Sequence, residues 1–64
     1  MSYICYVYER QGAVPYMEVL AARSVEDARA QVRGLLAERP YCTTAELWDE
    51  DILVHAFDRV ELAL

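Results

Sequence analysis

The fold is decided by the stretch SVEDARAQVRGLLAERP, residues 24–40, because it contains both a start and a stop signal for a helix. Ser24 is suited to cap the helix N-terminus, and Asp27 three residues later completes a variant of the capping box. Pro40 disfavours helical geometry at the preceding residue. Between these limits, apolar residues recur with the period of one buried stripe, at Ala28, Val32, Leu35 and Leu36. The sequence therefore predicts a helix over residues 25–38.

Strand-like segments precede and follow this helix. They are rich in β-branched and aromatic residues and span residues 2–9, 16–22, 41–48 and 52–57. This order predicts an α+β fold, ββαββ, in which a mostly antiparallel four-stranded sheet has one helix packed on one face. We expect one small domain over residues 1–64. The last strand is apolar on both faces and is expected in the centre of the sheet. Residues 58–64 are expected to add a short edge strand or to pack beneath the sheet.

One helix covers only one face of the sheet, so the other face stays open. Strand alternation places Ala45 and Leu47 on one face, with Glu46 and Trp48 on the other. Gly34 is expected to let the helix approach the sheet closely, with a hinge in the helix as the alternative. The open face is expected to carry several aromatic side chains from the set Tyr6, Tyr8, Tyr16, Trp48 and Phe57. Half-buried rings that only supply packing area are the favoured interpretation of this group, and a contact surface is the alternative.

The acidic residues are concentrated in the second half of the chain. Residues 1–39 hold five acids and five arginines, whereas residues 40–64 hold six acids and one arginine, so the net charge of −5 belongs to the latter. Such a surface repels nucleic-acid phosphates and anionic membranes, and it attracts a basic protein surface. We therefore predict a partner-binding surface that comprises Glu46, Trp48, Asp49, Glu50, Asp51, Asp58 and Glu61. A solvated acidic rim that aids solubility is the alternative interpretation.

Carboxylates along a strand and its turn can present charges at intervals close to those of phosphates. Residues two apart on one face of a strand are separated by about 6.6–6.8 Å. Successive phosphates of a DNA strand rise by about 3.4 Å, and helical winding roughly doubles their separation through space. The predicted mechanism is occlusion of a basic groove that nucleic acid would otherwise enter, with Trp48 as an anchor in the contact.

Residues that would carry enzyme chemistry are sparse. Cys5 and Cys42 are far apart in sequence and His55 is the only histidine, so neither a zinc site nor a cysteine–histidine nucleophile has a local signature. We predict no enzymatic activity, no metal and no cofactor. The cysteines are interpreted as small apolar strand residues in a reducing compartment, with a Cys5–Cys42 bridge as the alternative. The chain lacks a signal-peptide pattern and a long apolar run, which predicts a cytoplasmic protein. We expect it to be a monomer.

The acidic, lysine-free chain with the segment ELWDED, residues 46–51, resembles phage-encoded anti-CRISPR proteins of the type I class, with subtype I-C as the candidate target. Several of these are DNA mimics that block target DNA binding. The resemblance implies a basic DNA-binding subunit of a type I surveillance complex as the partner, in the bacterial host cytoplasm.

A second resemblance covers only the segment AELWD, residues 45–49, with Asp51 and Val54. It is similar to a hairpin of small uncharacterised proteobacterial proteins, in which glycine usually stands where this chain has Glu50. The alternative function is accordingly a small bacterial interaction domain that meets its partner through the aromatic sheet face.

Overall fold

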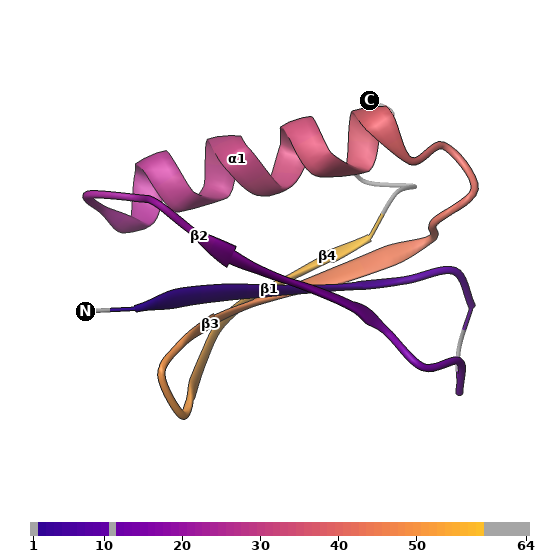
Figure 1. Ribbon diagram of the computed structural model, residues 1–64, viewed down its shortest axis with the longest axis horizontal. Helices are drawn as coiled ribbons and strands as arrows, with labels where there is room; N and C mark the ends of the chain where they lie inside the picture. The colour runs from indigo at the N-terminus through magenta and orange to yellow at the C-terminus, as the bar shows by residue number, and fades with distance from the viewer. Residues whose placement is uncertain (1, 11, 59–64) are drawn as a thin grey trace.

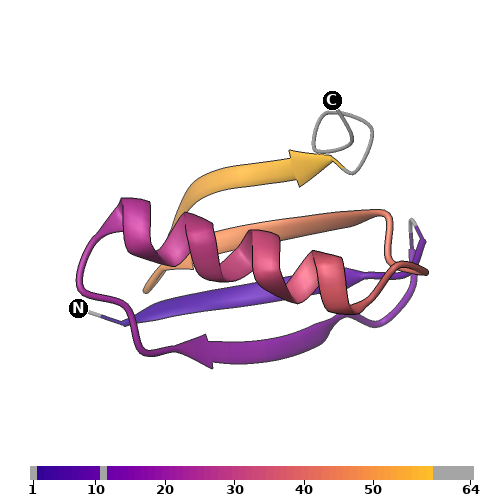
Figure 2. The ribbon, with the colours of Figure 1, turned by 90° about the horizontal axis from the view of Figure 1, so that it is seen from above.

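The computed structural model describes residues 2–10 and 12–58, which form one sheet and one helix. The elements are β1 (Tyr3–Tyr8), β2 (Tyr16–Leu20), α1 (Val25–Glu38), β3 (Thr44–Asp49) and β4 (Ile52–Asp58). All strand pairings are antiparallel, and the order across the sheet is β2-β1-β3-β4. The helix lies against one face of the sheet (Figure 1, Figure 2). The predicted α+β fold with the order ββαββ is confirmed.

The helix begins and ends where the sequence predicts. The Oγ atom of Ser24 accepts a hydrogen bond from the backbone N–H of Asp27 at 3.1 Å, and Ser24 itself has extended backbone geometry. The Asp27 carboxylate in turn accepts from the backbone N–H of Arg23 at 3.2 Å. At the other end, the backbone N–H of Arg39 donates to the carbonyl of Leu36 at 3.2 Å, which closes the last turn before the proline.

The core lies between α1 and the face of the sheet that it covers. Ala28, Val32 and Leu36 project from the helix, and residues of all four strands meet them. The buried residues from the strands are Tyr3, Cys5, Val7, Leu20, Ala45, Leu47 and Phe57. The alternation predicted for β3 is confirmed, because Ala45 and Leu47 are buried while their neighbours lie on the opposite face.

The interior glycine of α1 faces solvent. We predicted that Gly34 lets the helix approach the sheet closely, and this prediction is wrong. Gly34 is exposed, and no heavy atom lies within 4 Å of the position that an added Cβ would occupy. The close approach is made instead by the stripe of small and branched residues on another side of the helix.

The fourth strand lies at an edge of the sheet, whereas the sequence predicted it in the centre. β1 and β3 are the central strands. Both faces of β4 are mostly apolar, but Ile52 and Leu53 are 66% and 46% exposed and only Phe57 is buried. The pairing of β3 with β4 shifts between Leu47 and Trp48, which interrupts the alternation of β4. The expected extra strand after Asp58 lies outside the described residues.

Both cysteines are buried, and neither forms a disulfide. Cys5 lies in the middle of β1, and Cys42 lies in the connection between α1 and β3, not in a strand. Burial, together with the negative charge of Glu18 on the neighbouring strand, raises the pKa of the Cys5 thiol from 9.0 to about 11.

Alkaline pH is therefore expected to destabilise the fold through Cys5. The folded protein keeps the thiol proton more tightly than the unfolded chain does. The stabilisation is complete below pH 9 and is lost as the pH rises from 9 to about 11. Two pKa units correspond to about 2 to 3 kcal/mol of unfolding free energy. Urea unfolding of the protein and of a Cys5→Ala variant at pH 8 and pH 11 measures this loss. An identical pH dependence in the two proteins would contradict it.

Candidate functional site

The face of the sheet opposite α1 has no helix over it, and we call it the open face. The strand register assigns to it Ile4, Tyr6, Tyr8, Met17, Val19, Thr44, Glu46, Trp48, Leu53, Ala56 and Asp58. Met17, Val19 and Leu53 are each about half exposed or more. The tips of the β1–β2 and β3–β4 hairpins both project to this side, away from α1 (Figure 1). A partner that reaches the open face therefore lies between two hairpin tips.

The aromatic residues are divided between the two faces. Tyr6, Tyr8 and Trp48 lie on the open face, as predicted. Phe57 pairs with Ala45 on the helix side and is buried in the core, so it is not one of the aromatic residues that the open face carries. Tyr16 also lies on the helix side, at the edge of the sheet. The guanidinium carbon of Arg39 lies 4.0 Å from the centroid of its ring.

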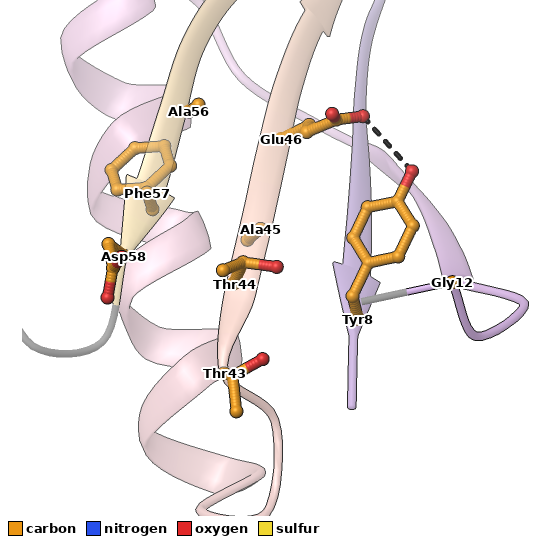
Figure 3. A pocket seen from close by; sticks show the side chains of 9 residues that line it. All are labelled: Tyr8, Gly12, Thr43, Thr44, Ala45, Glu46, Ala56, Phe57 and Asp58. Carbon is orange, nitrogen blue, oxygen red and sulfur yellow. Dashed lines mark hydrogen bonds between the residues drawn. The ribbon is translucent and has the colours of Figure 1, made fainter. Parts of the chain in front are cut away.

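A hydrogen-bonded carboxylate lies in the middle of the open face. The hydroxyl of Tyr8 and the indole N–H of Trp48 both donate to Oε1 of Glu46, each at 3.2 Å. Figure 3 shows the bond from Tyr8. Burial, followed by the hydrogen bond and the charge of Glu46, raises the pKa of the Tyr8 hydroxyl, so Tyr8 remains a donor at neutral pH. The two bonds fix the Glu46 side chain in one orientation.

Two shallow hollows flank this carboxylate. The central hollow, about 400 Å³, is lined by Tyr6, Tyr8, Pro15, Glu46, Trp48, Glu50 and Asp51. The edge hollow, about 640 Å³, lies toward β4 and is lined by Tyr8, Gly12, Thr43, Thr44, Ala45, Glu46, Ala56, Phe57 and Asp58 (Figure 3). Glu46 lines both, so a ligand in either hollow meets its carboxylate.

The structure brings together only some of the predicted partner-binding residues. Glu46, Trp48, Glu50 and Asp51 line the central hollow, and Asp58 lines the edge hollow. Asp49 lies apart from them. It pairs with the buried Tyr3 and lies two residues after the buried Leu47 in β3, so it is on the helix side of the sheet. Glu61 lies outside the described residues.

Sequence reasoning missed two contributions to this site. Tyr8 was expected only as an exposed aromatic, yet it donates to the central carboxylate. Pro15 was not among the predicted site residues, yet it lines the central hollow opposite the β3–β4 turn. Both contributions depend on the pairing of β1 with β3. That pairing joins segments about 40 residues apart in the chain, and no local motif reveals it.

Basic residues lie elsewhere in the part of the chain that the structure describes. Arg23, Arg29, Arg33 and Arg39 belong to α1 and its two ends, and Arg10 lies in the β1–β2 loop. The open-face strand positions include no arginine, lysine or histidine. The charged groups at these described positions are the carboxylates of Glu46 and Asp58, and carboxylates attract cations.

The β3–β4 turn holds one residue in a conformation that favours glycine. Glu50 has φ of +55° and is the one non-glycine residue with positive φ among the described residues. The left-handed region costs a residue with a Cβ about 1–2 kcal/mol. The backbone N–H of Glu50 donates to the carbonyl of Ser2 at 3.0 Å, which ties the turn to the start of β1.

Replacing Glu50 by glycine is expected to stabilise the protein. The Glu50→Gly variant relieves the left-handed strain and should raise the free energy of unfolding by about 1 kcal/mol, measured by urea denaturation. Asp51→Gly is the matched control, because Asp51 has no positive φ and glycine there only adds freedom to the unfolded chain. Equal effects of the two substitutions would show that Glu50 is not strained.

The residues considered for nucleophile and metal chemistry lie apart in the described structure. Cys5 and His55 pair with Leu47 from opposite sides, so their strands are about 10 Å apart and the two side chains cannot form a nucleophile–base pair. The His55 ring packs edge-on against Phe57 with centroids 4.6 Å apart. Within residues 2–10 and 12–58, no group of three or more histidine, cysteine, aspartate or glutamate side chains is placed to hold a metal ion.

Comparisons with protein families, with curated proteins and with solved structures gave no match. The described part of the chain contains no helix of the length and apolar character that crossing a membrane requires.

Proposed function

We propose that this protein is an inhibitor that binds a basic groove of a type I CRISPR surveillance complex, with subtype I-C as the first candidate, and keeps target DNA out of it. The observation that supports the proposal is the open face, where the described strand positions combine carboxylates with aromatic rings and include no arginine or lysine. A basic partner surface gains charge-assisted hydrogen bonds to such a face and apolar contact with it.

The positions of the carboxylates favour a partner that normally binds phosphates. Asp58 pairs with Thr44, two residues before Glu46 on the same face, so Asp58 and Glu46 are diagonal neighbours on adjacent strands. The backbone positions of such neighbours lie about 7–8 Å apart. This interval is close to that of successive phosphates along a nucleic-acid strand, about twice the rise of 3.4 Å. Glu50 and Asp51 extend the series to the tip of the hairpin. Together these acids follow the length of β3.

Two features reduce the conformational freedom that binding would otherwise remove. The side chain of Glu46 is held by Tyr8 and Trp48, and the backbone of Glu50 is held in a tight turn by its hydrogen bond to Ser2. Groups that are ordered before binding lose less entropy in the complex. Retention of a strained glutamate where glycine would be more stable also favours a functional use of its side chain.

A second candidate function uses the same face differently. Met17, Val19 and Leu53 are exposed on the open face, and an apolar partner would bury them without needing the acids. The protein would then be a small interaction domain of the bacterial cytoplasm.

The salt dependence of binding separates the two candidates. Fluorescently labelled protein is titrated with purified type I-C surveillance complex without DNA at 50 and 300 mM salt, and the exclusion of a target duplex is measured separately. We expect direct binding that weakens by about 10-fold or more over this range, together with loss of target DNA binding. Binding that salt leaves unchanged would support the apolar candidate. No binding at 50 mM would contradict the choice of a type I-C partner.

A further inference from the structure

We propose that the central hollow is a receptor for a single arginine side chain, presented by a protein partner. This inference rests on the proposed function, because it names the group on the partner that the open face recognises. The walls of the hollow include the rings of Tyr6, Tyr8 and Trp48, and Glu46 carries a carboxylate in it. An aromatic wall beside a fixed carboxylate is a suitable environment for a planar cation.

The Glu46 carboxylate keeps an acceptor for the ligand. Both of its hydrogen bonds, from Tyr8 and from Trp48, fall on Oε1. Oε2 accepts no hydrogen bond from the described residues, so it can receive one from a guanidinium N–H. The carboxylates of Glu50 and Asp51 line the same hollow and add negative potential.

Arginine fits this hollow better than lysine does. Its guanidinium is planar, is weakly hydrated and stacks on aromatic rings, whereas an ammonium group is compact and strongly hydrated. The protein already makes this kind of contact elsewhere, with the Arg39 guanidinium carbon 4.0 Å from the centroid of the Tyr16 ring. An anionic ligand is disfavoured, because three carboxylates line the hollow.

The test uses capped Gly-Gly-X-Gly-Gly peptides in which X is arginine, lysine or citrulline. Citrulline has nearly the shape of arginine but no charge. Trp48 is the only tryptophan in the chain, so its fluorescence and its indole N–H resonance report on this hollow directly. At 20 mM salt we expect saturable changes with the arginine peptide, affinity about 3-fold lower for lysine and about 10-fold or more lower for citrulline.

Two variants assign the effect to the carboxylate. Glu46→Gln keeps an oxygen that accepts from Tyr8 and Trp48 but removes the charge, and we expect affinity for the arginine peptide to fall about 10-fold. Glu38→Gln removes the same charge from the exposed end of α1 and should leave the affinity unchanged. Thermal unfolding checks that both variants fold.

The arginine receptor would be overturned by citrulline binding as tightly as arginine, by absence of any change at Trp48, or by equal effects of the two variants. The peptides test the hollow without the surveillance complex. If the arginine peptide does not bind but the protein still binds the surveillance complex in a salt-dependent way, the arginine receptor is wrong and the proposed function stands. If the arginine peptide binds but the complex does not, only the choice of partner is wrong.

Discussion

The double variant Glu50→Lys/Asp51→Lys is expected to lose affinity for the surveillance complex by about 100-fold or more. Both residues line the central hollow at the tip of the β3–β4 hairpin. The two acids attract a basic groove, whereas the two lysines repel it. Like charges at an interface cost several kcal/mol. The measurement is displacement of labelled wild-type protein from the purified complex at 100 mM salt.

A variant with the same change in net charge serves as the control. Glu26→Lys/Glu38→Lys reverses two exposed glutamates at opposite ends of α1, so the effects on the helix dipole oppose each other. We expect this control to bind within about 5-fold of the wild type, because its changes lie on the side away from the open face. Equal losses in the two double variants would mean that net charge matters and its location does not.

Truncating the helix side of the core is expected to remove a large part of the stability of the domain. Leu36 is 1% exposed and is among the largest fully buried side chains. Leu36→Ala leaves a cavity and should cost about 3 kcal/mol. A domain of this size has a total stability of only about 3–10 kcal/mol. The melting temperature, followed by far-ultraviolet circular dichroism, should fall by more than about 10 °C.

The neighbouring leucine provides the control for this substitution. Leu35 is the same residue type in the same turn of α1 but is only partly buried. Leu35→Ala should therefore cost less than half as much as Leu36→Ala. A larger loss for Leu35→Ala would mean that the buried stripe of α1 is rotated from the position described above.

Local signals in the sequence predict the elements well. The bounds of α1 follow from Ser24, Asp27 and the proline after Arg39, each of which acts within one helical turn. Strand order depends instead on which segments pair across the sheet. β4 is apolar on both faces and was therefore placed in the centre, but its apolar residues are partly exposed at the edge. Composition does not distinguish a buried strand from an apolar edge strand.

The candidate site was predicted in part for the same reason. Alternation along one strand placed Glu46 and Trp48 on the face opposite Leu47, and it also implies that Asp49 lies with Leu47. Grouping the acids by their nearness in the chain ignored this alternation. The bond from Tyr8 to Glu46 depends on the register between β1 and β3, which is not encoded in any short motif.

Site-specific labelling tests most directly whether the open face is the binding surface. Ala56 lies exposed on the open face beside Glu46, and Ala30 lies exposed on α1. Ala56→Cys and Ala30→Cys each introduce one accessible thiol, because Cys5 and Cys42 are buried.

Each variant is coupled to a maleimide–polyethylene glycol chain and assayed for exclusion of target DNA from the surveillance complex. We predict that the label at position 56 abolishes inhibition while the label at position 30 leaves it intact. The assignment of the open face would be contradicted if only the label at position 30 abolished inhibition. It would also be contradicted if each of the two labelled variants inhibited fully.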